Sequence, residues 1–122
     1  MNVTVSFLRT HRDHIFVFGD NIERTGKGGA AELRDELNTY GFITKRAPNF
    51  KDEAYFTPKE YKKIYQQELM KLKAKIQENP SKTFLISKIG SGLANKHGIF
   101  EEVIEPGIKK ALKNYKNVIF LW

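Results

Sequence analysis

The distribution of apolar residues along the chain predicts five β-strands. Uninterrupted apolar runs, which are typical of buried strands, occur at residues 15–18, within residues 82–87 and at residues 118–122. Residues 3–7 alternate apolar and polar side chains, as a half-buried strand does, and residues 41–45 form a further short strand. We expect the three apolar runs to be among the central strands of one sheet.

A long helix is predicted between residues 58 and 78. Thr57 is a suitable N-cap, Pro58 suits the first helical position, and Glu60 completes a capping box. One face of this helix is apolar and lysines cover most of the remainder. The apolar face consists of Tyr61, Ile64, Tyr65, Leu69, Leu72 and Ile76.

Two further helices are expected, at residues 30–37 and 99–114. Gly41 suits the C-cap of the first helix, while Pro106 and Gly107 predict a kink or break in the second. Strands that alternate with helices in this way predict a three-layer α/β fold, with a central mixed sheet flanked by helices. The length of 122 residues fits a single domain.

The strand predicted at residues 15–18 leads into a glycine-rich turn with the character of an anion site. The turn GKGG, residues 26–29, directly precedes a helical pattern that begins at Ala30. Glycines let a backbone approach a ligand closely, and the N–H groups at a helix start point toward it. The turn is not a Walker A loop, because glycines follow Lys27, and not a Rossmann turn, because Ala31 replaces the last glycine. A tight strand-to-helix connection without a ligand is the alternative.

A second glycine-rich turn, residues 88–93, follows the strand predicted at residues 82–87. Ligands of open α/β sheets bind at the carboxyl ends of the strands. Because both glycine turns follow strands, we expect them to face one cleft.

The charge of the chain favours a negatively charged partner. It has 21 Lys and Arg against 14 Asp and Glu, which gives a net charge of +7. Such an excess suits a nucleotide or direct contact with a nucleic acid. Many of the lysines lie in residues 59–75, however, where a solvated helix face is the plainer interpretation.

The composition limits the kinds of binding site and the cellular locations that fit the protein. The absence of cysteine excludes disulfides and thiolate zinc sites and fits a cytoplasmic protein. No cluster of carboxylates or cysteines joins His11 and His14, so neither a metal site nor a cofactor is expected. No apolar run is long enough to cross a bilayer, no signal segment is expected, and no membrane partner is expected.

The order of these motifs over residues 16–122 resembles the macrodomain fold, which binds ADP-ribose. The nearest resemblance is to the branch of the terminal ADP-ribose glycohydrolase and the DNA ADP-ribosyl glycohydrolase antitoxins. A G-x-G-x-A turn of that branch looks like residues 26–30, a strand ending in Thr-Lys and a basic residue looks like residues 43–46, and an Ile-Gly-Cys-Gly-Leu loop looks like residues 89–93. Small bacterial and phage proteins of unassigned function share the FGDN and G-x-GG-x-A patterns.

The resemblance implies a macrodomain-like protein that binds ADP-ribose, either free or attached to a protein, nucleic acid or small molecule. It implies that Asp20 and Asn21 lie at the adenosine end, where an acid accepts from the adenine amino group. The first turn would surround the distal ribose, and the second would bind the diphosphate through backbone N–H groups. The implied ligand-binding residues are Gly19, Asp20, Asn21, Gly26, Lys27, Gly28, Gly29, Ala30, Ile89, Gly90, Ser91, Gly92 and Leu93.

Lys45 matches the catalytic lysine of that branch, which attacks the anomeric carbon of the distal ribose. An amine needs to be partly deprotonated for this role, through burial or through nearby cations such as Lys27 and Arg46. A strand-end lysine that is exposed to solvent is the alternative interpretation of Lys45.

The chain departs from the terminal glycohydrolase after Leu93. Ala94 and Asn95 stand where that enzyme has an aspartate, and neither side chain transfers a proton. His97, in a longer loop, either takes over proton transfer, lies near the phosphates or is a surface residue. Two functions stay open: hydrolysis of an ADP-ribosyl linkage, or binding of an ADP-ribose-related nucleotide signal without turnover, as a phage-encoded sponge would do.

Overall fold

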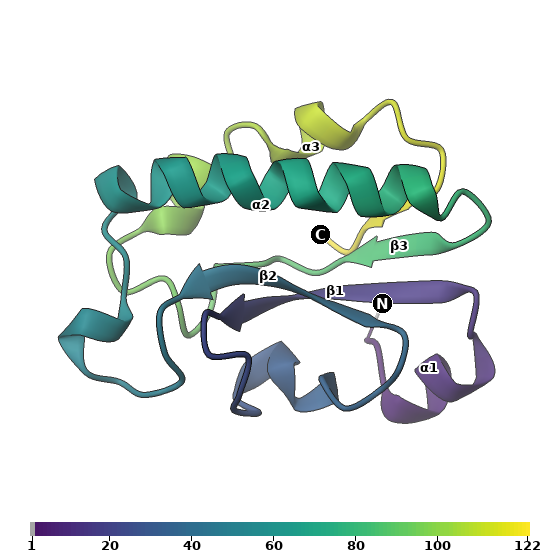
Figure 1. The fold of residues 1–122 in the computed structure, drawn as a ribbon, viewed down its shortest axis with the longest axis horizontal. Helices are drawn as coiled ribbons and strands as arrows, with labels where there is room; N and C mark the ends of the chain where they lie inside the picture. The colour runs from purple at the N-terminus through teal and green to yellow at the C-terminus, as the bar shows by residue number, and fades with distance from the viewer. Residues whose placement is uncertain (1) are drawn as a thin grey trace.

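The computed structural model describes residues 2–122, which form one four-stranded sheet between two layers of helices (Figure 1). The strand order is β2-β1-β3-β4, and all neighbouring strands are parallel. The strands are β1 (His14–Asn21), β2 (Thr39–Lys45), β3 (Thr83–Ile86) and β4 (Val118–Phe120). The helices are α1 (Val5–Thr10), α2 (Pro58–Glu78) and α3 (Ile108–Leu112), the 3₁₀-helices η1 (Gly29–Leu33) and η2 (Asp52–Ala54), and the π-helix η3 (Phe100–Ile104).

Both faces of the sheet are buried, which confirms the predicted α/β class. α2 and α3 cover one face, and α1 and η1 cover the other (Figure 1). Ile15 and Val17 of β1 belong to the core beneath α2, whereas Phe16 and Phe18 belong to the core beneath α1 and η1. An uninterrupted apolar run is therefore what β1 requires, because alternate side chains point to opposite faces.

The prediction of a mixed sheet is wrong. Among residues 2–122 all four strands are parallel, and the antiparallel pairing is confined to an isolated bridge between Lys45 and Tyr55. Each strand is connected to the next through a helix, which returns the chain to the same end of the sheet. The expected central place of residues 118–121 is also wrong, because β4 lies at an edge and its residues are half-buried or exposed.

The predicted strand at residues 3–7 is also wrong, because this part of the chain enters helix α1. Thr4 is the N-cap, and its Oγ1 accepts a hydrogen bond from the Phe7 N–H at 3.1 Å. Leu8 is the residue of α1 that is buried. The short apolar–polar alternation was compatible with either conformation, and a capping threonine decided between them.

The helix predicted at residues 30–37 is limited to the 3₁₀-helix η1, which ends at Leu33. β2 begins at Thr39, whose hydroxyl donates to the Glu36 carbonyl at 3.0 Å. The strand therefore begins before Gly41, the predicted cap of the helix. Gly41 lies inside β2 and is not a C-cap. A Cβ at Gly41 would collide with the Asp20 carboxylate, so this glycine is required by a tertiary contact.

Helix α2 begins and ends where the sequence predicts. Thr57 accepts from the Glu60 N–H at 3.3 Å, and Glu60 accepts from the Thr57 N–H at 3.0 Å, which completes the capping box. The break predicted at Pro106 and Gly107 is confirmed as well, because it separates η3 from α3.

Side chains of α2 also bind the outer edge of β2. Glu68, which is buried, accepts the Ile43 N–H at 2.7 Å, and the Tyr61 hydroxyl donates to the Ile43 carbonyl at 2.5 Å. Burial beside Glu68 raises the pKa of Tyr61, so its hydroxyl keeps its proton as a donor. These contacts satisfy backbone groups that an edge strand leaves unpaired.

We expect Glu68→Ala to lower the free energy of unfolding by roughly 1–3 kcal/mol, because it leaves the Ile43 N–H buried without an acceptor. Urea denaturation measures the change. Glu68→Gln keeps an acceptor oxygen and is the matched control, so it should lose less stability. Equal stability of the alanine variant and the wild type would contradict this account of the β2 edge.

Candidate functional site

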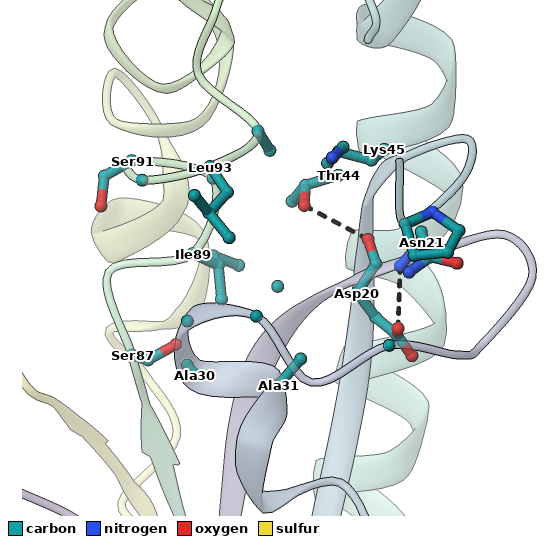
Figure 2. Close-up of a pocket in the computed structure, with 18 of the residues that line it drawn as sticks. Asp20, Asn21, Ala30, Ala31, Thr44, Lys45, Ser87, Ile89, Ser91 and Leu93 are labelled. Atoms are coloured by element: carbon teal, nitrogen blue, oxygen red, sulfur yellow. Dashed lines mark hydrogen bonds between the residues drawn. The ribbon is translucent and has the colours of Figure 1, made fainter. Parts of the chain in front are cut away.

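One pocket lies at the carboxyl ends of β1, β2 and β3, with a cavity volume of about 310 Å³ (Figure 2). That volume is at the lower end of the roughly 300–1,000 Å³ typical of small-molecule sites. Both glycine turns border it, as predicted. The residues that the resemblance implies for ligand binding all line this pocket, as does Lys45: Gly19, Asp20, Asn21, Gly26, Lys27, Gly28, Gly29, Ala30, Lys45, Ile89, Gly90, Ser91, Gly92 and Leu93.

Asp20 holds the first glycine turn in place through Arg34. Its side chain is buried, and Arg34 binds it with both terminal nitrogens, at 2.6 Å to Oδ1 and 3.3 Å to Oδ2. Arg24 adds a third contact at 3.2 Å to Oδ2. Arg34 also donates to the carbonyls of Thr25 and Gly26, at 3.0 and 2.7 Å, and so holds the turn against β1.

These contacts correct the expectation that Asp20 accepts a hydrogen bond from an adenine amino group. The carboxylate is already bound by two guanidinium groups and by the Asn21 N–H at 2.8 Å. It serves as a counter-ion inside the wall of the pocket. Asn21 has a similar structural role, because its Nδ2 donates to the Thr25 carbonyl at 2.7 Å, while its buried Oδ1 has no donor within residues 2–122.

The first glycine turn presents unpaired backbone donors. The Ala31 N–H closes the first 3₁₀ turn on the Gly28 carbonyl at 3.2 Å. In the described part of the chain, the N–H groups of Gly28, Gly29 and Ala30 have no acceptor. Lys27 is exposed and forms an ion pair with Asp35, so part of its charge is already balanced.

The second glycine turn offers a similar set of donors. Gly90 has φ +80° and passes so close to Ile104 that a Cβ would lie 2.5 Å from its Cδ1, which explains why a glycine is needed. Within residues 2–122 the N–H groups of Gly90, Gly92 and Leu93 have no acceptor. The Ser91 hydroxyl is not free to donate, because it is bonded to the Lys88 carbonyl at 2.6 Å.

Three loops meet around the pocket. A Cβ at Gly28 would lie 2.9 Å from Leu93, which brings the two glycine turns into contact. A Cβ at Gly26 would lie 2.8 Å from Pro48, which joins the first turn to the loop after β2. The glycines thus allow segments distant in sequence to approach one another at the mouth of the pocket.

Lys45 is 8% exposed, so the interpretation of a solvent-exposed lysine is wrong. Its Nζ donates to the Asn49 carbonyl at 2.9 Å and lies 4.7 Å from the ring centre of Tyr55 and 5.1 Å from that of Phe50. Burial lowers the pKa of Lys45. The expected help from neighbouring cations is not found.

The two cations expected to assist Lys45 are both paired elsewhere. Arg46 binds Glu60 at 2.7 Å, and Lys27 binds Asp35. His97 is not among the residues that line the pocket. Its ring packs edge-on against Tyr55, and its Nε2 lies 4.0 Å from the Asp52 carboxylate.

The sequence did not indicate the arginines that shape the pocket. Arg34 and Arg24 belong to no motif, and their relation to Asp20 depends on the path of the chain between β1 and β2. Further lining residues were also missed, although most adjoin predicted ones. They are Thr25, Ala31, Thr44, Pro48, Ser87, Lys88 and Ala94.

The structure therefore defines an α/β protein with one glycine-lined pocket at the carboxyl end of a parallel sheet. Residues 1–98 match the family DUF7831, which is described as a family of unknown function. The chain belongs to that family. No curated protein and no solved structure matches the chain. Within residues 2–122, no helix is both long enough and apolar enough to pass through a membrane.

Proposed function

We propose that the pocket binds ADP-ribose, either free or as part of an ADP-ribosylated molecule, in a macrodomain-like manner. The observation that carries this proposal is the presence of two glycine turns with unpaired N–H groups around one pocket. Backbone N–H groups of this kind form nests for phosphate oxygens. Two such sets on facing loops suit a ligand with two linked phosphates.

The charges around the pocket support an anionic ligand. Lys27, Lys45 and Lys88 are among the lining residues. Of the residues that line the pocket, Asp20 is the one with a carboxylate, and two arginines neutralise it. A diphosphate would therefore meet donors and positive charge without an opposing free carboxylate.

Binding without turnover fits the pocket better than hydrolysis does. The residues lining the pocket include no histidine, and the carboxylate among them, that of Asp20, is bound by Arg34 and Arg24. General acid–base catalysis needs a group that can release and accept a proton near the reacting atoms. The proposed biological role is therefore recognition or sequestration of an ADP-ribose-related signal.

Isothermal titration calorimetry with ADP-ribose tests the proposal, with NAD and a cyclic nucleotide as comparison ligands. We expect ADP-ribose to bind with saturable, stoichiometric heat. Absence of ADP-ribose binding, at protein concentrations that detect a millimolar dissociation constant, would overturn it. Preference for the cyclic nucleotide would assign the pocket to a different signal.

Hydrolysis is a second candidate function, and the buried amine of Lys45 is the observation that favours it. The amine would attack the anomeric carbon of the distal ribose. The bond to the acceptor would break, and the acceptor would leave with the bonding electrons and take a proton from water. The lysine adduct would lose a proton and open its ribose ring to a Schiff base, which water would hydrolyse to release ADP-ribose and restore the amine.

If Lys45 is a nucleophile, Lys45→Arg is expected to abolish release of ADP-ribose from ADP-ribosylated DNA or protein. Arginine keeps the positive charge but lacks the nucleophilic amine, so ADP-ribose should still bind. Borohydride added during turnover should trap the wild-type adduct, which mass spectrometry would assign to Lys45. Full activity of the arginine variant would exclude Lys45 as the nucleophile, whereas no release by the wild type would exclude the hydrolytic function.

A further inference from the structure

We propose that the outer face of helices α2 and α3 binds the phosphate backbone of a nucleic acid, at a surface separate from the pocket. The observation that carries this inference is the location of the net charge. Helix α2 and residues 108–117, which contain α3, have ten lysines and three glutamates, whereas the rest of the chain has eleven Lys and Arg and eleven Asp and Glu. The whole net charge of +7 therefore belongs to these two segments.

The two segments form one surface. Helices α2 and α3 cover the same face of the sheet and share one hydrophobic core (Figure 1). The Gln77 side chain of α2 donates to the Tyr115 hydroxyl at 2.8 Å. Lys73 lies one helical turn before Gln77, and Lys116 adjoins Tyr115, so lysines of both segments meet here. Because β3 and β4 begin just after these residues, this part of the surface lies at the amino ends of the strands, away from the pocket.

Almost all of these lysines lack a carboxylate partner. Among residues 2–122, the ion pair within 4.0 Å that involves a lysine of either segment is that of Lys71 with Glu68. Elsewhere, by contrast, Lys96 is bound to Asp52 at 2.6 Å. A merely solvated helix face usually mixes charges of both signs, which offset one another. The uncompensated lysines of α2 and α3 instead favour an anionic partner.

The chemistry of the surface indicates a nucleic acid and not a protein or a membrane. Protein interfaces are depleted in lysine and depend on buried aromatic and arginine side chains. A membrane-bound helix needs a free apolar face, but that of α2 is buried in the core, and Met70 is the one large apolar side chain exposed on the described parts of α2 and α3.

Lysines suit a regular row of phosphates, because each ammonium group acts as a point charge and needs no fixed geometry. Helix α2 has 21 residues and is about 30 Å long, which corresponds to about nine base pairs of duplex DNA. Such contacts carry no sequence information, so we expect the surface to bind nucleic acids regardless of sequence.

Fluorescence anisotropy with a short labelled DNA duplex tests the inference, at salt concentrations between about 50 and 200 mM. We expect the wild type to bind two duplexes of unrelated sequence equally and to lose affinity steeply as salt rises, because phosphate contacts release counterions. The triple variant Lys110→Gln, Lys113→Gln, Lys116→Gln changes exposed side chains and should bind more weakly. Its plot of log affinity against log salt should be less steep by roughly 2–3, about one for each lost phosphate contact.

The matched control is the triple variant Arg9→Gln, Lys51→Gln, Lys96→Gln, which removes the same charge from other exposed positions. These residues lie outside α2, α3 and the pocket. The control should keep the affinity and the salt dependence of the wild type, and thermal unfolding checks that both variants are folded. Excess ADP-ribose should not displace the duplex, because the two sites are separate.

Three results would overturn the inference. The first is no binding of the duplex by the wild type at about 50 mM salt, and the second is equal weakening by the two triple variants, which would make net charge and not this surface responsible. The third is displacement of the duplex by ADP-ribose, which would place the nucleic acid in the pocket. Binding to phosphatidylserine vesicles without binding to DNA would likewise replace the inference with a membrane contact.

Discussion

Gly92→Glu is expected to abolish ADP-ribose binding while leaving the protein folded. A Cβ at Gly92 would meet nothing within 4 Å, and its φ is not in the left-handed region, so the loop accommodates a side chain. The carboxylate would stand beside the unpaired N–H groups that are proposed to bind phosphate. Two negative charges about 4 Å apart repel by roughly 1–4 kcal/mol at effective dielectric constants of 80 to 20, and the carboxylate also competes for the donors.

Calorimetry measures the loss of binding, and thermal unfolding checks that the fold is intact. Gly92→Ala is the matched control, because it adds a Cβ without charge and should bind nearly as the wild type does. Retention of ADP-ribose affinity in Gly92→Glu would place the phosphate site elsewhere. Gly90 would be a poor substitute for this test, because its φ of +80° and its contact with Ile104 make any side chain there disruptive.

Replacement of Arg34 by alanine is expected to cause the largest loss of stability among single changes at the pocket. It removes two hydrogen bonds from the buried Asp20 carboxylate and two from carbonyls of the first glycine turn. Breaking a buried ion pair from one side typically costs about 3–5 kcal/mol, and the remaining contact with Arg24 should keep the effect toward the lower limit.

Chemical denaturation measures how far Arg34→Ala lowers the free energy of unfolding. Hydrogen exchange of the turn at residues 25–30 should increase as well, because its carbonyls lose their anchor. Arg9→Ala is the control, since it removes an arginine that pairs with Glu36 on the exposed surface and should change stability little. If Arg34→Ala and Arg9→Ala have the same free energy of unfolding, the buried Asp20 carboxylate does not need Arg34 as a counter-ion.

Features set by local sequence were predictable. Helix α2 carries its own start signal in Thr57, Pro58 and Glu60, and its apolar stripe has the period of a helix. The two glycine turns were recognised because each follows an apolar run, and α/β sheets bring such turns together. The glycines and Lys45 could therefore be assigned to one pocket without knowledge of the strand order.

Features set by distant contacts were not predictable from one sequence. Gly41 resembled a helix cap, but its role is to admit Asp20 and Arg24 over β2. Asp20 resembled a ligand acceptor, but Arg34, fourteen residues later in the chain, occupies it. The apolar residues of β4 matched a central strand, although among residues 2–122 β3 is the one strand that pairs with it. In each case the deciding partner comes from another element.

The outer edge of β2 has a consequence for self-association of the protein. The Gly41 carbonyl is bound by Arg24 at 2.8 Å, Ile43 is bound by Glu68 and Tyr61, and Lys45 is bridged to Tyr55. Another chain cannot extend the sheet there without displacing these groups. Within residues 2–122, no side chain is hydrogen-bonded to the backbone of β4, which lies at the other edge of the sheet. Intermolecular strand addition, as in domain swapping or fibril growth, would therefore be directional and begin at residues 118–120.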